Sequence, residues 1–144
     1  MHSTVRRFSY VLSIVLLAPM VSGGAPADIP SSKEDFHLFL LMGQSNMSGG
    51  VGLAAGDTQP VPHVLKMLYF KEGTEPKWAP GAHPLHPRRP NKKPRFGPGI
   101  SFAEAYVANK PGIVVGLIPM AWGGRSIVHL SKGSEIYSDA IRHT

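Results

Sequence analysis

Ser45 stands just after an apolar run, in a setting that suits a nucleophile. The stretch FLLMGQSNMSGG covers residues 39–50. A serine hydroxyl attacks a carbonyl effectively only with a base nearby and with N–H donors directed at the developing oxyanion. A second apolar run, at 113–119, ends in AWGGRSI, whose glycines allow backbone amides to approach closely. The two clusters together favour acyl transfer, while a plain turn remains the alternative for each.

Other motifs that use serine, phosphate or metal are incomplete. No lysine follows Gly49 and Gly50 as a Walker A loop requires, and G-x-G-x-x-G is missing. Met47 replaces the last glycine of a G-x-S-x-G elbow. His83 and His86 form an H-x-x-H flanked by prolines, which is a weak zinc motif. We therefore expect no metal and no cofactor.

Several segments have the pattern of regular structure, and they alternate in type. These are a strand buried on both faces at 37–42, a strand or short helix at 63–70, a helix at 101–109, a strand at 113–119, and the start of a helix at 134–143. Alternating β and α segments predict an α/β fold with a parallel sheet. Both polar clusters then follow the carboxyl ends of strands, where such sheets bind ligands.

The expected helix at 101–109 has recognisable boundaries. Ser101 and Glu104 have the spacing of a capping box, and Phe102, Ala105 and Tyr106 fall on one face. Lys-Pro-Gly at 110–112 ends the helix.

A proline-rich insert covers about residues 56–99. Nine of the fourteen prolines lie between Pro60 and Pro98, and proline disrupts both helices and strands. Long loops in compact domains are often functional or lid-like. The insert includes the basic run HPRRPNKKPR, which has no interleaved aromatic residues. We interpret that run as a solvated loop and expect no nucleic-acid partner.

The first 27 residues predict a secretory signal peptide. Arg6 and Arg7 precede an apolar run at 8–21, and small residues follow at 22–27. This order predicts cleavage between residues 23 and 27, because the run is short for a membrane span and Pro19 interrupts it. The mature chain, 28–144, is then secreted or periplasmic and has no membrane anchor. Removing both arginines lowers the formal net charge from +6 to +4.

The chain contains no cysteine, and 42% of its residues are hydrophobic. It therefore has no disulfide and no thiol nucleophile, and its stability depends on an ordinary apolar core. Its 144 residues correspond to a single domain at most.

Three blocks resemble the sialate O-acetylesterase-like carbohydrate esterases of the SGNH hydrolase superfamily. The blocks are LFLLMGQSNMSG, GPGISFAEAYV and VVGLIPMAWGGRSI, and the resemblance extends over roughly 36–144. It implies a three-layer, flavodoxin-like α/β fold, here apparently truncated. It also implies a secreted serine esterase that removes O-acetyl groups from an oligo- or polysaccharide through an acyl-serine intermediate.

The resemblance assigns roles to individual residues. Ser45 matches the nucleophile, and the amides of Ser45 and Gly124 match the oxyanion hole, with Gly123 as the less favoured alternative to Gly124. Gly97 and Gly99 lie in the matching block before the helix, where a simple tight turn explains them equally well. The residues that would line the substrate pocket are Gln44, Asn46, Gly123, Arg125 and Ser126.

The family pattern also includes blocks that this sequence lacks. A W-x-Q-G-E-type block supplies a further oxyanion donor, and D-x-x-H supplies the Asp and His of the triad. No histidine in this chain has a persuasive spacing to replace them, including His129 and His143. We therefore interpret the chain as the N-terminal part of an esterase and expect it to be impaired by itself. The alternative is a non-catalytic carbohydrate-binding remnant that uses the same pocket with Trp78 and Trp122. The sequence predicts neither which acetylated sugar is bound nor an oligomeric state.

Overall fold

The computed structural model describes residues 28–68, 77–86 and 93–144. The predicted signal peptide at 1–27 lies outside the described residues, as does much of the basic run, at 87–92. Within the described part, no helix has the length and apolarity needed to cross a membrane.

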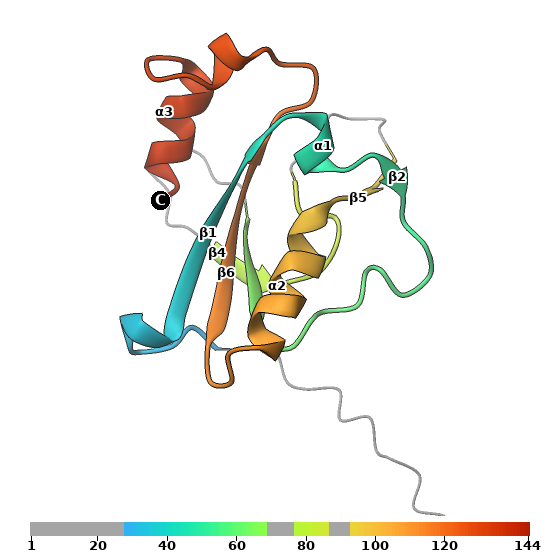
Figure 1. Cartoon of the computed structure of the whole chain (residues 1–144), viewed down its shortest axis with the longest axis vertical. Coiled ribbons are helices and arrows are strands. Elements are labelled where there is room, and N and C mark those ends of the chain that lie inside the picture. Colours follow the sequence, from blue (N-terminus) through green and yellow to red (C-terminus); the bar gives the residue numbers. More distant parts are fainter. Residues whose placement is uncertain (1–27, 69–76, 87–92) are drawn as a thin grey trace, which may run out of the picture.

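In the described part of the chain, four strands follow one another between the first and second α-helices, and a further strand separates the second α-helix from the third (Figure 1). In order, the elements are the 3-10 turn Lys33–Asp35, β1 (Phe36–Gly43), α1 (Ser45–Ser48), β2 (Val51–Gly52), β3 (Val64–Leu68), β4 (Lys77–Pro80), β5 (Arg95–Phe96), α2 (Pro98–Ala108), β6 (Val114–Ala121), the 3-10 turn Ile127–Leu130 and α3 (Glu135–Arg142).

The main sheet has the strand order β1-β6-β3-β4. β6 pairs in parallel with both β1 and β3, and β4 is the antiparallel strand at one edge. β2 and β5 form a separate two-stranded ribbon. The mostly parallel α/β sheet confirms the predicted fold class and is consistent with a flavodoxin-like fold.

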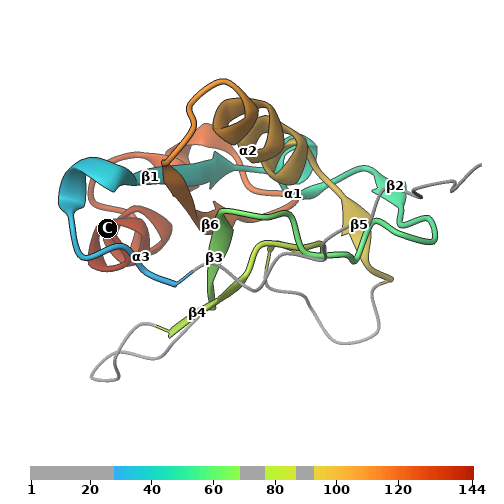
Figure 2. The same cartoon turned by 90° about the horizontal axis from the view of Figure 1, so that it is seen from below.

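Helices pack on opposite faces of the sheet, as the two views show (Figures 1 and 2). On one face, Ile100 and Ala103 of α2 belong to an apolar cluster with Leu117 of β6. On the other face, Ala140 of α3 belongs to a cluster with Ile118. Successive residues of a strand point to opposite faces, so β6 supplies side chains to both clusters and forms the centre of the core.

β1 corrects the prediction of a strand buried on both faces. Leu38 and Leu40 remain 47% and 38% exposed, whereas every residue of β6 is buried. β1 is an edge strand of the described sheet, and one of its faces packs under α2 through Phe39 and Leu41. On the other face, Met42 is the one residue of β1 that packs against the cluster around α3. An apolar run alone does not distinguish this edge strand from the central one.

α2 begins three residues before the predicted start, and the predicted capping box is wrong. Gly97 is the N-cap, without a side-chain hydrogen bond, and Pro98 occupies the first turn. Proline is favoured there because its missing N–H would be unpaired in any case. The buried face starts with Gly99 and Ile100, while Phe102 is 41% exposed.

The two remaining elements follow the predictions more closely. Of the segment predicted at 63–70, residues Val64–Leu68 form a strand, β3, rather than a helix, and 69–70 lie outside the described residues. The C-terminal helix α3 starts at Glu135, where the hydroxyl of Ser134 accepts a hydrogen bond of 3.2 Å from the Tyr137 amide. This cap satisfies one of the unpaired N–H groups of the first turn.

Candidate active site around Ser45

The structure brings the two polar clusters to the same edge of the sheet. Gly43, the last residue of β1, lies opposite Ala121, the last residue of β6. The amide of Trp122 then donates to the Gly43 carbonyl at 2.9 Å and extends the pairing by one step. The segments that begin at Gln44 and Trp122 therefore leave the sheet side by side.

Ser45 is the first residue of the four-residue helix α1, and it is exposed. The Gln44 carbonyl accepts hydrogen bonds from the amides of Met47 and Ser48, at 3.1 and 3.0 Å. The amides of Ser45 and Asn46 precede these bonds, at a position where helical N–H groups lack intrahelical partners. The turn thus presents the Ser45 hydroxyl together with backbone donors.

Gly123 is the glycine of the second cluster that lies against Ser45. A Cβ added to Gly123 would be 3.9 Å from both Cα and Cβ of Ser45. Gly124 has a φ of +76°, and a Cβ added there would meet open space. The positive φ explains why glycine occupies position 124, whereas the oxyanion role of its amide stays a prediction.

The second cluster also contains two buried donors without partners among the described residues. They are Nε1 of Trp122 and Nε of Arg125. Buried polar atoms are nearly always hydrogen-bonded, so these donors indicate a place for an acceptor. Ser126 differs, because its hydroxyl shares a hydrogen bond of 2.9 Å with Nδ1 of His129. Ser126 is therefore already engaged locally.

Two glycines at the start of α2, Gly97 and Gly99, are closely packed against other parts of the chain. A Cβ on Gly97 would be 2.8 Å from the Met47 carbonyl oxygen and 3.2 Å from the Gly49 amide nitrogen. A Cβ on Gly99 would be 2.6 Å from a methyl group of Leu41 and equally close to one of Leu85. Close approach, rather than a simple turn, thus explains both glycines, which the sequence alone left undecided.

His86 contributes in a way that its sequence context did not predict. It is buried, and its Nδ1 accepts a hydrogen bond of 3.2 Å from the Ala121 amide. β3 pairs with β6 only as far as Leu117, so that amide lacks a neighbouring strand. Because Nδ1 is an acceptor, the neutral ring carries its proton on Nε2. His86 therefore secures the end of β6 directly before the second cluster.

The titration of His86 leads to a prediction about acid stability. Burial lowers the pKa of His86 from 6.5 to about 4; neighbouring His83 reinforces this shift and the Met47 carbonyl opposes it. Between these pH values the unfolded chain binds more protons at His86 than the folded chain does. The free energy of unfolding therefore falls as the pH drops from about 6.5 to 4. His86 should account for about 3 kcal/mol of that loss between pH 7 and 4.

The matched variant is His86→Asn, whose side-chain oxygen can replace the Nδ1 acceptor but does not titrate. Urea unfolding of both proteins at pH 7 and pH 4 measures the difference. We expect the variant to lose less stability on acidification than the wild type. Equal losses in the two proteins would show that His86 is not the responsible group.

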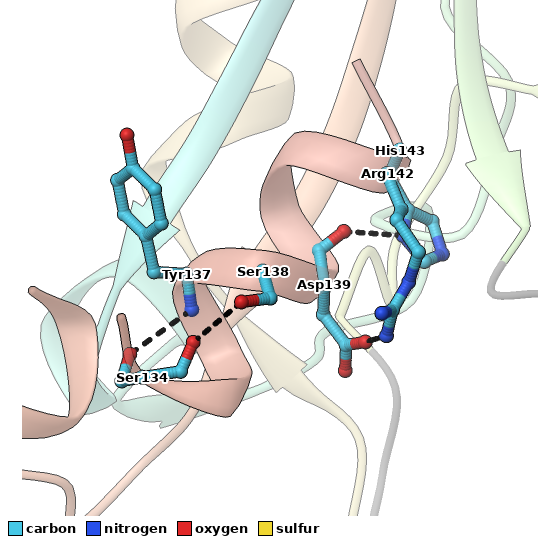
Figure 3. Close-up of polar contacts among 6 residues, drawn as sticks. All are labelled: Ser134, Tyr137, Ser138, Asp139, Arg142 and His143. Atoms are coloured by element: carbon cyan, nitrogen blue, oxygen red, sulfur yellow. Dashed lines mark hydrogen bonds and ion pairs between the residues drawn. The ribbon is translucent and has the colours of Figure 1, made fainter. Parts of the chain in front are cut away.

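No hydrogen bond joins the Ser45 hydroxyl to a histidine within the described ranges. The C-terminal Asp and His do not form a catalytic pair either (Figure 3). The Asp139 carboxylate pairs with Arg142, and it is the Asp139 backbone carbonyl that meets Nδ1 of His143, at 2.7 Å. A base for Ser45 is therefore not found in this part of the chain.

Metal ligands do not cluster in the described part of the chain, where no group of three or more His, Asp or Glu side chains could hold an ion. In the H-x-x-H motif, Nδ1 of His86 is occupied by the Ala121 amide.

Comparisons with known proteins agree with the predicted fold class and with the predicted family resemblance. The family of carbohydrate esterases described as sialic acid-specific acetylesterases matches residues 35–144. A curated relative, a probable carbohydrate esterase from Arabidopsis thaliana, is 29% identical over 135 residues, which covers 81% of this chain and 50% of the relative. The crystal structure of that Arabidopsis protein superposes with a TM-score of 0.60 and 27% identity, covering 76% of this chain and 49% of that one.

The α/β fold is thus shared with a relative that is described as a probable carbohydrate esterase. The chain belongs to the carbohydrate esterase family of sialic acid-specific acetylesterases. It spans about half the length of the Arabidopsis relative that it matches.

Proposed function

We propose that this protein is a secreted or periplasmic serine esterase that removes O-acetyl groups from an oligo- or polysaccharide. The observation that carries the proposal is the exposed Ser45 at the end of β1, with Gly123 packed beside it and unpaired donors in the same cluster. Family membership supports carbohydrate esters as the substrate class.

In the proposed reaction, the Ser45 hydroxyl attacks the acetyl carbonyl and the sugar leaves as an alcohol. Water then releases acetate from the acetyl-serine. The amides of Ser45 and Gly124 stabilise the oxyanion in both steps. Gln44, Asn46, Gly123, Arg125 and Ser126 surround the substrate, and the buried Nε of Arg125 is suited to an acceptor oxygen.

The base must come from the family's D-x-x-H block, which this sequence does not contain. We therefore expect the 144 residues alone to be impaired, and the tests of catalysis use a form extended by the family's W-x-Q-G-E and D-x-x-H blocks, called the complete form below. Without the base, Ser45 remains a weak nucleophile.

The test is acetate release from acetylated oligosaccharides. We expect the complete form to release acetate and to leave the sugar chain intact, whereas the 144-residue chain should be slower by several orders of magnitude. A complete form that folds but releases no acetate from any acetylated sugar would refute the proposal.

A second candidate is a non-catalytic carbohydrate-binding protein. The unpaired donors of Trp122 and Arg125, together with the missing base, favour it. The two tryptophans cannot share one pocket, however, because Trp78 packs against Phe36 and beside Gly116, whereas Trp122 follows the other end of β6. The two ends are separated by roughly 20 Å of strand. This candidate predicts sugar binding without acetate release.

A further inference from the structure

A cavity of about 290 Å³ lies beside α2, apart from the Ser45 turn. Its walls come from the loop after β2, from β5 and from the first half of α2. Figure 1 shows that loop running alongside α2. Small-molecule pockets start at about 300 Å³, so the cavity has the size for one sugar ring rather than for a long ligand.

The lining of the cavity combines an aromatic surface with hydroxyl-binding groups. Phe96 and two prolines, with Val61 and Ile100, supply the apolar part, and the polar part includes Asp57, Gln59, Ser101 and Glu104. Apolar walls with a few convergent polar groups are typical of ligand sites. Carboxylate and amide oxygens accept hydrogen bonds from hydroxyl groups, of which a sugar ring carries several.

His83 gives a second and independent indication of a ligand. It lines the cavity, is only 4% exposed, and packs against the Phe96 ring at 4.5 Å between centroids. Neither of its ring nitrogens has a hydrogen-bond partner among the described residues. Burial lowers the pKa of His83, so the ring is neutral and offers one donor and one acceptor.

The charges around the cavity discriminate between sugar types. Asp57 and Glu104 are carboxylates, while His83 is neutral. Lys66 is not one of the lining residues, and its ammonium donates to the carbonyls of Ala82 and Pro84, although its charge acts on His83. A negatively charged lining repels the carboxylate of an acidic sugar.

The cavity and the Ser45 turn share one structural segment. The side chain of Phe96 lines the cavity, while its carbonyl accepts a hydrogen bond of 3.2 Å from the Gly50 amide. Gly97, the next residue, packs against the backbone of α1. The cavity and the Ser45 turn are therefore connected through residues 96 and 97.

We propose that this cavity binds a neutral pyranose unit of the carbohydrate substrate and excludes acidic sugar units. The inference rests on the proposed function for its choice of ligand class. It adds a second sugar site and a charge preference to the acetyl site at Ser45.

The experiment compares two probes that differ only at C6, methyl glucoside and methyl glucuronide. Each is titrated into the ¹⁵N-labelled 144-residue chain at low salt, up to about 50 mM, because single sugars bind weakly. We expect the glucoside to shift the amides of Gln59, Ser101 and Glu104. The glucuronide should bind about tenfold more weakly.

Two variants and one control locate the effect. Glu104→Gln, at an exposed position of α2, should reduce the difference in affinity between glucoside and glucuronide to roughly threefold. Phe96→Leu keeps an apolar side chain but removes the ring, and should weaken glucoside binding about fivefold. Glu135→Gln, an exposed substitution on α3, should leave both affinities unchanged.

Several outcomes would overturn the inference. These are glucuronide binding as tight as glucoside binding, shifts confined to residues near Ser45 such as Asn46, or no shift of the cavity amides at the highest concentration. If the complete form releases acetate but its cavity amides do not shift with the glucoside, the second sugar site is refuted while the esterase proposal stands. Cavity binding in a complete form that releases no acetate would support the site and refute the esterase.

Discussion

Replacing Ser45 with alanine should lower the rate of acetate release by the complete form on the order of 10⁴-fold or more. The hydroxyl of Ser45, the first residue of α1, is the proposed attacking group. The substitution should hardly affect folding, because Ser45 is exposed. The measurement is the initial rate of acetate release, with thermal unfolding as the check on structure.

Ser48→Ala is the matched control in the same short helix. Its hydroxyl donates to the Ser45 carbonyl at 3.3 Å, which is a weak local bond. We expect this variant to keep its rate within severalfold. Equal losses in both variants would indicate that the helix, rather than the Ser45 hydroxyl, matters.

Gly97→Ala should damage the site through the backbone. The new Cβ would come within 2.8 Å of the Met47 carbonyl oxygen, and backbone atoms cannot move aside as a flexible side chain can. We expect a loss of about 1–3 kcal/mol in stability, as for other overpacked sites, and a displaced α1. Small displacements of a nucleophile can cost about 10²-fold in rate, so activity should fall more than stability.

Gly50→Ala is the control for a new methyl group in the same region. A Cβ on Gly50 meets nothing within 4 Å. This variant should retain both stability and rate. Urea unfolding and acetate release, measured on both variants, check the comparison; a Gly97→Ala protein as active as Gly50→Ala would refute the supporting role of Gly97.

The sequence alone predicted the elements that carry the Ser45 site. Apolar runs followed by glycine and small polar residues located β1 and β6, and their parallel pairing brought the two clusters together. The start of a helix predicted at 134–143 is confirmed by α3. These features depend on residues that are neighbours in the chain, which is why one sequence is enough to predict them.

Features that depend on distant contacts could not be predicted in this way. The exposure of Leu38 depends on which helices cover β1, and the role of Gly97 depends on how close α1 lies. The contact of His86 with Ala121 joins residues 35 positions apart. Local spacing also misplaced the start of α2, because Ser101 and Glu104 imitate a cap inside a helix that Pro98 already began.

The most direct test of the account is to trap the acyl-enzyme. The complete form is mixed with an acetylated oligosaccharide, quenched in acid within milliseconds to seconds, digested and analysed by mass spectrometry. We predict one added acetyl group on the peptide that contains Ser45, which appears before free acetate accumulates and is absent from Ser45→Ala. Steady acetate release with no acetyl group on that peptide at any time, or with the acetyl group on another residue, would contradict the central role of Ser45.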